Sequence, residues 1–242
     1  MIELKKIALE DLITNQRIDL GFFDPPDNER RKYDNYGDNL PEAEYVAQLR
    51  RWLAKADEVV SGPIFFTIAM KWLPDMELAC RDLGIKVIQR IFWHYTFGQN
   101  LKTKYAPCLR PIYWLRDNRI FPEPISVPSA RQTKYHDQRA NPGGKLPECL
   151  WEFPRVCGTF KARRRWHPTQ FPVALLERII LGHSTQGMTV LDGFIGSGTT
   201  AYACLANHRN CVGLDVSNSY LAHIRDELIG RGASDADIIG GV

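Results

Sequence analysis

VLDGFIGSGTT, at residues 190–200, is the stretch that decides the fold of this chain. An apolar run leads into an acid and a glycine-rich turn, and a small apolar segment follows, a pattern typical of a buried strand, a loop and a helix. Gly196 and Gly198 carry no Cβ atom, so the backbone can turn sharply and approach a ligand. Asp192 falls where open α/β sheets bind their ligands. The stretch predicts a ligand-binding α/β domain.

Three classes of cofactor compete for this loop. A phosphate-binding P-loop would require a lysine where Thr199 stands. A dinucleotide loop is matched by Gly196, Gly198 and Ala201, with Asp215 as the acid for a ribose, but too few residues follow to build the second half of a dinucleotide fold. A mononucleoside cofactor such as S-adenosylmethionine fits the remaining length, and Asp192 suits its positive charge.

A second motif, LGFFDPPD at residues 20–27, ends another apolar run in an acid and two prolines. Asp24 and the carbonyl of Pro25 could accept both N–H groups of an exocyclic amino group. Pro25 and Pro26 fix φ and keep the preceding residue extended, which would hold these acceptors in place. By itself the motif is also compatible with a plain turn after a strand.

Together the two motifs resemble those of the amino-methyltransferases that modify adenine or cytosine in DNA, in a permuted subgroup whose catalytic motif precedes the cofactor motif. WHPTQFPVALLERII, at residues 166–180, is similar to the HPTQKP segment of that subgroup. The resemblance implies a Rossmann-like methyltransferase fold, S-adenosylmethionine as methyl donor and a target base flipped out of the duplex. It implies catalytic roles for the DPPD motif and cofactor contacts in two segments: Asp24, Pro25, Pro26 and Asp27, then His167, Thr169, Gln170, Asp192, Phe194, Gly196, Ser197, Gly198, Thr199 and Asp215.

Two positions depart from the family pattern. Asp27 stands where relatives carry an aromatic residue that stacks on the flipped base, so we expect Tyr33, Tyr36 or Trp72 to supply the ring. Alternatively, the chain is a catalytically impaired DNA-binding relative. Gly193 replaces the usual proline and is expected to loosen the turn.

Hydrophobic periodicity predicts a mostly parallel mixed sheet flanked by helices. The expected strands are Ile18–Phe23, Ile64–Ala69, Val87–Tyr95, Arg110–Leu115, Thr189–Leu191 and Cys211–Leu214, with Val87–Tyr95 and Arg110–Leu115 forming an antiparallel pair. The expected helices are 41–60, 73–83 capped by Gly84, Pro172–Leu181 capped by Gly182, Thr199–Asn207 and Ser219–Ile229. The last ten or so residues are expected to fray.

Charge and proline content divide the chain into three parts. Residues 1–116 would form the catalytic half of the methyltransferase domain, 117–165 an irregular target-recognition insertion, and 166–242 the cofactor-binding half. Residues 116–166 carry eleven Lys and Arg against five Asp and Glu, although the whole chain has a net charge of only +3. This stretch suits contact with double-stranded DNA, although a solvated loop is the alternative. The expected phosphate contacts are Arg131, Lys134, Arg139, Lys161, Arg163, Arg164 and Arg165.

Adenine is favoured over N4 of cytosine as the target, because an Asp opens the catalytic motif where many cytosine-amino enzymes carry Ser. Methylation of a ring carbon is disfavoured, since Pro107-Cys108 lies outside the catalytic stretch. A nucleotide-dependent oxidoreductase and a methyltransferase acting on RNA or protein stay open.

Composition excludes several other classes. The chain has 44% apolar and 24% charged residues, and its six cysteines show no CxxC spacing, so neither a metal site nor a disulfide framework is expected. The N-terminus is too charged for a signal peptide, and no apolar run is long enough to span a membrane. We expect a cytoplasmic protein of a bacterial or phage-infected cell. Its oligomeric state is open, and a homodimer is compatible with the sequence.

Overall fold

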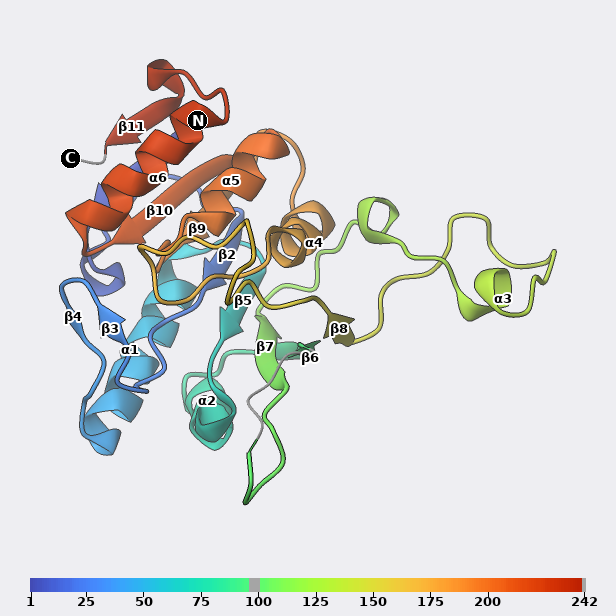
Figure 1. Cartoon of the computed structure of the whole chain (residues 1–242), viewed down its shortest axis with the longest axis horizontal. Coiled ribbons are helices and arrows are strands. Elements are labelled where there is room, and N and C mark those ends of the chain that lie inside the picture. The colour runs from blue at the N-terminus through green and yellow to red at the C-terminus, as the bar shows by residue number, and fades with distance from the viewer. Residues whose placement is uncertain (96–100, 241–242) are drawn as a thin grey trace.

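The computed structural model describes residues 1–95 and 101–240. Their main sheet has the order β11-β1-β10-β9-β2-β5-β7-β6-β8 (Figure 1). Its strands are β1 (Ile2–Lys6), β2 (Leu20–Phe23), β5 (Ile64–Thr67), β6 (Val87–His94), β7 (Leu109–Leu115), β8 (Leu150–Glu152), β9 (Thr189–Asp192), β10 (Asn210–Asp215) and β11 (Ile238–Gly240). The helices are α1 (Glu42–Val59), α2 (Leu73–Asp82), α3 (Ala130–Thr133), α4 (Val173–His183), α5 (Thr199–Ala206) and α6 (Asn218–Gly230).

One strand of this sheet runs against the others. The pairs β11 with β1, β1 with β10, β10 with β9, β9 with β2, β2 with β5 and β6 with β8 are parallel, whereas β7 is antiparallel to both β5 and β6. The predicted mostly parallel mixed sheet is therefore confirmed, including its antiparallel pair. Because β7 is reversed, its first residues lie at the edge where the parallel strands end.

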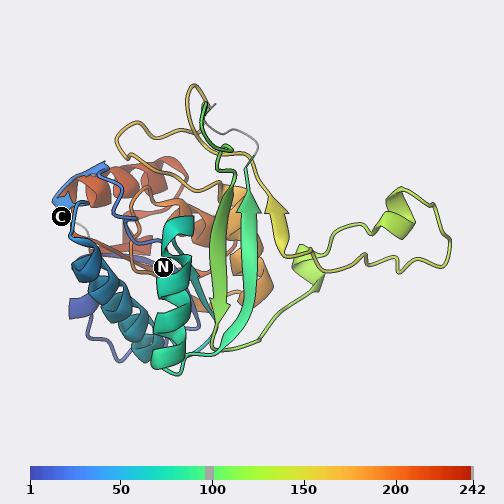
Figure 2. The same cartoon turned by 90° about the horizontal axis from the view of Figure 1, so that it is seen from below.

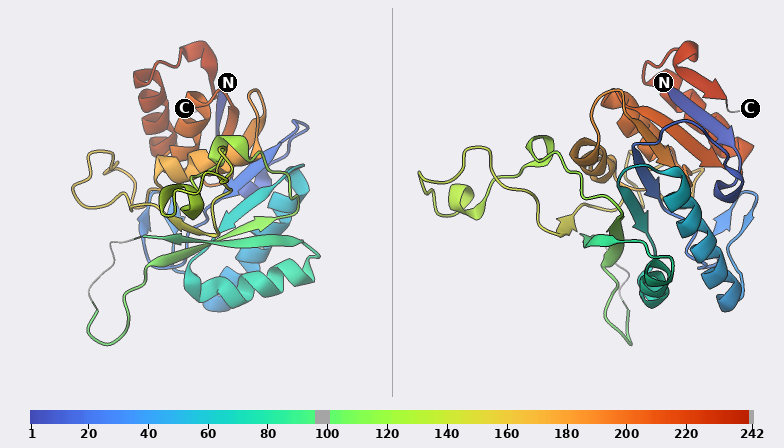
Figure 3. Two further views of the ribbon diagram at one scale, coloured as in Figure 1. Left: turned by 90° about the vertical axis from the view of Figure 1, so that its right-hand side faces the viewer. Right: turned by 180° about the vertical axis from the view of Figure 1, so that it is seen from behind.

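Helices cover both faces of the sheet, and the strand sequences alternate between the two cores. Phe22 and Phe65 face the core shared with α4, α5 and α6, whereas their neighbours Phe23 and Phe66 face the core shared with α1 and α2. Figures 1 and 3 show the two helical layers on opposite sides of the strands. Strands buried on both faces read as continuous apolar runs, which explains why LGFF and IFFT lack a polar alternation.

Three strands that the sequence analysis did not predict join this sheet. β1 lies between β10 and β11, so the start of the chain is paired on both sides with its last third. The expectation of a frayed C-terminus is wrong for Ile238–Gly240, because that segment forms β11. β8 lies within the predicted insertion and pairs with β6 at the opposite edge.

The two glycines predicted to cap helices behave differently. Gly84 has φ of 69° just after α2 and ends that helix as expected. Gly182 lies inside α4, which continues to His183. A Cβ atom at Gly182 would lie 2.8 Å from Cδ1 of Ile125, so this glycine permits close packing of the helix against the segment that enters the insertion. The cap at Gly182 is therefore a wrong prediction.

Residues 128–144, which we call the arm, extend away from the body of the protein (Figures 1 and 2). The arm is closed at its base by two backbone hydrogen bonds between Val127 and Lys145, of 2.8 and 2.9 Å. α3 is the only α-helix in the arm, and its capping box joins Ser129 to Gln132. The insertion is irregular as predicted, apart from α3, β8 and a short 3-10 turn at Glu123–Ile125.

Candidate active site

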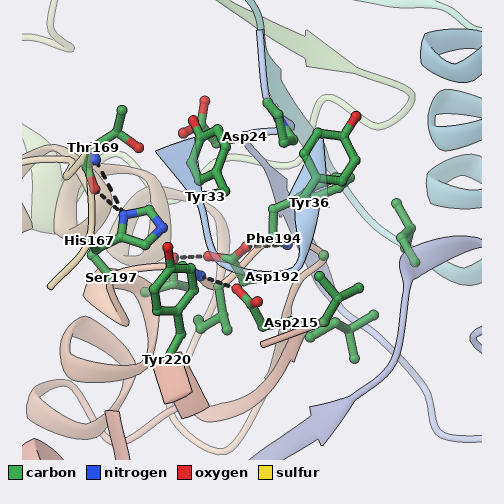
Figure 4. Close-up of a pocket in the computed structure, with 18 of the residues that line it drawn as sticks. Asp24, Tyr33, Tyr36, His167, Thr169, Asp192, Phe194, Ser197, Asp215 and Tyr220 are labelled. Carbon is green, nitrogen blue, oxygen red and sulfur yellow. Dashed lines mark hydrogen bonds between the residues drawn. The ribbon is translucent and has the colours of Figure 1, made fainter. Parts of the chain in front are cut away.

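Three acids meet at the carboxyl edge of the sheet. Asp24 follows β2 directly, Asp192 is the last residue of β9 and Asp215 is the last residue of β10. These strands are parallel neighbours in the order β10-β9-β2, and Phe22 pairs with Asp192. All three side chains line one cavity of about 350 Å³ (Figure 4). The sequence motifs at opposite ends of the chain therefore share one site.

The glycine loop is held by the acids on either side of it. The Asp192 carboxylate accepts a 2.9 Å bond from the amide of Phe194 and a 2.5 Å bond from the hydroxyl of Thr200. Asp215 accepts a 3.1 Å bond from the amide of Gly196 and a 2.9 Å bond from the amide of Ser217. These bonds fix the loop before any ligand arrives, which lowers the entropic cost of binding.

Close packing explains two glycines in this loop. Gly196 has φ of 45°, and a Cβ atom there would lie 2.8 Å from Nε2 of His167. Gly193 was expected to loosen the turn, and the structure corrects that expectation. A Cβ atom at Gly193 would lie 2.7 Å from the Phe23 ring and 3.3 Å from Leu9, so glycine allows the turn to pack tightly.

Two segments cover the cavity from above. His167 lies with its ring centroid 4.7 Å from that of Tyr220 and 5.8 Å from that of Tyr33. Tyr33 belongs to the hairpin of β3 (Lys32–Tyr33) and β4 (Tyr36–Gly37). Asp34, at the tip of that hairpin, accepts a 2.6 Å bond from the hydroxyl of Ser217 and donates its amide to the Tyr220 hydroxyl. Figure 4 shows these aromatic side chains around the acids.

Burial controls the protonation of the site. Burial raises the pKa of Asp192 to about 7 and the pKa values of Asp24 and Asp215 to about 6. Burial also lowers the pKa of His167 to about 4, so the imidazole is neutral near pH 7. The cavity thus concentrates carboxylates that share a low-dielectric space without a compensating histidine charge. A cationic ligand would complement it.

The remaining predicted cofactor residues also line the cavity, with the exception of Gly198. Ser197 and Thr199 are buried, and their hydroxyl oxygens lie 3.1 Å apart. Gln170 donates to the carbonyl of Ala162 and accepts from the amide of Arg164, so it ties the approach to α4 together. Gly198 has φ of 79° and packs against Tyr202 behind the loop.

In the catalytic motif, Asp24 and Pro26 line the cavity, while Pro25 is buried. The Pro26 carbonyl accepts a 2.8 Å bond from the hydroxyl of Tyr45. Among the described residues no donor is bonded to the Pro25 carbonyl.

Asp27 points away from the cavity. Its carboxylate accepts the amide of Ala69 at 2.7 Å and binds Arg110 with both oxygens, at 2.6 and 3.1 Å. Arg110 also contacts Asp24 at 2.5 Å. Arg110 was not among the predicted site residues, although an arginine opening the apolar run RPIYWL was a signal that it has buried partners.

The structure separates the three candidate rings. Tyr33 and Tyr36 line the cavity. Trp72 is 5% exposed, donates its indole N–H to the Asp27 carbonyl at 2.8 Å and packs on Tyr45. Trp72 therefore fixes the catalytic loop from behind, and its expected role as a stacking ring is wrong.

The predicted DNA-contacting residues fall into two exposed groups and one buried residue, Arg164. Lys161, Arg163 and Arg165 are exposed on the loop before His167. Arg131, Lys134 and Arg139 are exposed on the arm, where Arg131 and Arg139 both pair with Asp137.

Arg164 requires a correction. It is 8% exposed, pairs with Glu227 at 2.6 Å and stacks 4.4 Å from the Tyr202 ring centre. Its guanidinium is held inside the protein, so we remove it from the expected phosphate contacts.

Within residues 1–95 and 101–240, His, Cys, Asp and Glu side chains form no group of three or more that could hold a metal ion. No helix in the same ranges combines the length and apolar character needed to cross a bilayer.

Comparison with known proteins assigns the chain to a family. The profile of the N6/N4 family described as "DNA methylase" matches residues 18–226. The chain is 33% identical over 228 residues to the type II methyltransferase M.HpaI of Haemophilus parainfluenzae, covering 91% of this chain and 71% of that protein. The chain belongs to the DNA methylase family. Members of this methylase family use S-adenosylmethionine as the methyl donor.

One further relative agrees with the assignment to the DNA methylases, and one solved structure shows the same fold. The chain is 32% identical over 238 residues to the DNA adenine methyltransferase YhdJ of Escherichia coli, covering 91% of this chain and 77% of that protein. The crystal structure of the complex of M1.HpyAVI with S-adenosylmethionine superposes with a TM-score of 0.63 at 21% identity, covering 94% of this chain and all of that chain. The fold is thus the Rossmann-like methyltransferase fold that the sequence predicted.

The side chains that line the cavity of this DNA methylase match the chemical groups of S-adenosylmethionine. The cofactor carries an ammonium and a sulfonium, and the cavity offers the carboxylates of Asp24, Asp192 and Asp215 at the strand ends, with Glu10 and Asp34 also in its lining. Asp215 lies at the end of β10, where an acid can accept hydrogen bonds from ribose hydroxyls.

We predict that affinity for S-adenosylmethionine falls on acidification. A bound cation favours the ionised carboxylates, so affinity is complete above the raised pKa of Asp192 and is lost as the pH falls through 7 and then 6. Titration calorimetry should show a dissociation constant about 10- to 100-fold larger at pH 5 than at pH 8. The Asp192→Asn variant should bind weakly at pH 8 and show a shallower dependence between pH 6 and 8. Equal affinity of the wild type at both pH values would contradict this account of the cavity.

Proposed function

We propose that this protein methylates the exocyclic amino group of adenine at specific sites in double-stranded DNA, in the cytoplasm of a bacterial or phage-infected cell. One observation carries the proposal. Asp24, the acceptor for the amino group, faces the same cavity as the glycine loop and its acids. This juxtaposition would bring a target nitrogen and a methyl donor together without any movement of the sheet, so positioning supplies much of the catalysis.

Cofactor binding is assigned to the residues around the loop. Asp215 would hold the ribose hydroxyls, and Asp192 the positive charge. His167, Thr169 and Gln170 would close over the methionine end. When bound, S-adenosylmethionine supplies an electrophilic methyl group on a sulfonium sulfur.

The chain's own contribution to the chemistry is to prepare the amino group. Its nitrogen lone pair is delocalised into the base, which makes it a poor nucleophile. Asp24 would accept one amino N–H and the Pro25 carbonyl the other, so that the nitrogen becomes pyramidal and its lone pair is free to attack. Asp24 is the nearest base for the proton that the nitrogen loses, and its raised pKa near 6 suits that task. No cysteine nucleophile is needed.

We assign the ring that stacks on the flipped base to Tyr33. Tyr33 lines the cavity, as Asp24 does. Burial raises the pKa of the Tyr33 hydroxyl, and the negative charge of Asp24 raises it further, so the phenol stays neutral. Tyr36 also lines the cavity, but Glu10 and Asp38 are the charges that act on its hydroxyl. The aromatic residue missing at Asp27 would then be replaced from the neighbouring hairpin.

DNA contact is assigned to the exposed loop that carries Lys161, Arg163 and Arg165 and to the arm. The loop leads directly into His167, so phosphates bound there would lie close to the cavity mouth. The arm projects from the body (Figure 2), and we propose that it lies along the duplex. The arm would contribute Arg131, Lys134 and Arg139 to the backbone and its other polar side chains to base edges.

The first test identifies the product. DNA incubated with the protein and S-adenosylmethionine is digested to nucleosides and analysed by mass spectrometry. We expect 6-methyladenine, and the Asp24→Asn variant should lose about 100-fold or more of the rate, because one preorganised acceptor is removed. 4-Methylcytosine would shift the target to cytosine. Neither product, together with tight DNA binding, would indicate a non-catalytic relative and contradict the proposal.

The second test concerns Tyr33. Tyr33→Ala should slow methylation by about 5- to 150-fold, since stacking contributes about 1–3 kcal/mol per base. Tyr33→Phe keeps the ring and should retain most of the activity. Single-turnover rates with saturating cofactor measure the effect. If Tyr36→Ala is the slower variant and Tyr33→Ala is near wild type, the ring is assigned to the wrong tyrosine.

A third test examines the phosphate contacts. The double variant Lys161→Gln with Arg163→Gln should reduce the slope of log K against log salt by about 2, because each phosphate contact releases about one counterion. Arg81→Gln with Lys86→Gln is the matched control, since these exposed residues lie near the start of β6, at the opposite edge of the sheet. Fluorescence anisotropy with a labelled duplex gives both slopes. Equal slopes for the two double variants would remove the loop from the DNA interface.

A further inference from the structure

Arg110 reaches the active site because its strand is reversed. It is the second residue of β7, and β7 begins at the edge where β2 and β5 end. If β7 ran parallel to β5, an arginine at its start would lie at the end of the sheet where β2 and β5 begin, away from the cavity. The side chain is only 17% exposed and its guanidinium lies 5.8 Å from the Phe171 ring centre, so it approaches the catalytic motif from inside the protein.

The guanidinium donates three hydrogen bonds to the motif and a fourth to Thr67. Nη2 donates to Asp24 at 2.5 Å and to Asp27 at 3.1 Å, Nη1 donates to Asp27 at 2.6 Å, and Nε donates to the hydroxyl of Thr67 at 2.8 Å. The paired bonds to Asp27 have the forked geometry that fixes a guanidinium in orientation. Arg110 therefore connects the first and the last residue of the DPPD motif.

Asp27 is itself immobilised. Its carboxylate accepts the amide of Ala69, and its carbonyl accepts the indole N–H of Trp72. An aromatic residue at this position would offer the guanidinium no carboxylate. The replacement of the aromatic residue and the presence of Arg110 thus belong to one arrangement.

We propose that Arg110, anchored by Asp27, is a positioning residue that binds one carboxylate oxygen of Asp24 and leaves the other for the target amino group. The inference rests on the proposed methyl transfer. Oδ1 of Asp24 is the atom that binds Arg110, and among the described residues no donor reaches Oδ2. A carboxylate held by one oxygen keeps a fixed plane, and the acceptor aimed at the base does not have to be found by rotation.

The charges around Asp24 predict the direction in which each substitution shifts its pKa. Burial raises the pKa of Asp24, Arg110 on β7 lowers it, Asp27 in the same loop raises it, and Arg31 lowers it. Asp192 on β9 and Tyr33 on β3 also interact with Asp24. Loss of the Arg110 charge should therefore raise the pKa of Asp24, whereas loss of the Asp27 charge should lower it.

The experiment measures the pH dependence of single-turnover methylation for Arg110→Gln, Arg110→Lys and Asp27→Asn. Arg110→Gln should move the acidic limb of the profile to higher pH and lower the plateau at least about tenfold. Arg110→Lys keeps the charge and should restore the position of the limb but not the full plateau. Asp27→Asn should lower the plateau while moving the limb to lower pH.

The matched control is Arg90→Gln. Arg90 lies on β6, the strand next to β7, and forms a two-bond pair with Glu77 of α2, and neither residue lines the cavity. Its profile should match the wild type. A folded Arg110→Gln protein with wild-type cofactor affinity, plateau and acidic limb would overturn the inference. If Arg110→Gln does not fold, an Arg110→Lys protein with a wild-type plateau overturns it equally.

A second readout does not need activity. Carbon-13 resonances of labelled aspartates report the pKa of Asp24, assigned by the signal lost in Asp24→Asn. We expect this pKa to rise in Arg110→Gln and fall in Asp27→Asn. If the wild type methylates no nucleic acid but these shifts occur, the proposed function fails and the coupling of Arg110 to Asp24 stands. Unchanged shifts in an active enzyme contradict the coupling itself.

Discussion

The parallel pairing of β2 with β9 is the constraint on which the rest of this structure depends. Phe22 lies beside Asp192 in that register, so the two strand ends deliver Asp24 and the glycine loop to the same edge. The chain has to cross the sheet several times between these strands, and more than 160 residues separate the two acids in the sequence. Once the strands are paired, no further arrangement is required to form a single cavity. The apolar runs that drive this pairing are therefore as much a part of the site as the acids.

A cavity lined by carboxylates destabilises the folded protein, because burial disfavours their charge, but it favours the binding of a cationic cofactor. Burial opposes the ionisation of Asp24, Asp192 and Asp215, and the charges of Asp24 and Asp215 raise the pKa of Asp192 further. The chain offsets this cost with backbone amides at Asp192 and Asp215 and with Arg110 at Asp24. Because the amides carry no net charge, the carboxylates of Asp192 and Asp215 can still attract a positive ligand. Of these three acids, only Asp24, which we assign to the target base, pairs with Arg110, and Arg110 is shared with Asp27 outside the cavity.

Local chemistry made much of this molecule predictable. The glycine loop, the strand and acid of the DPPD motif and the amphipathic helix that became α1 are written in short stretches, so their sequences sufficed to place them. β1 was not predicted, because IELKK has too few apolar residues to indicate a strand until β10 and β11 are known to flank it. β11 was not predicted because its three residues are too few to indicate a strand before their pairing with β1 is known.

Long-range partners account for what the sequence could not show about the site. Arg110 lies 86 and 83 residues from the two acids that it joins, and nothing in its neighbourhood indicates them. Arg164 belongs to a run of basic residues that predicted exposure, but Glu227 and Tyr202 reach it from α6 and α5. Trp72 was a reasonable candidate ring until the structure showed that its indole is bound to the Asp27 carbonyl.

The most direct test of this account is a crystal structure of the protein with S-adenosylmethionine or its demethylated product bound. The account predicts that the ribose contacts Asp215, that the methionine end lies under His167 and Thr169, and that the sulfur faces Asp24 across the cavity. A cofactor seated elsewhere, or one whose sulfur is separated from Asp24 by the sheet or a helix, would contradict the claim that the two motifs form one active site.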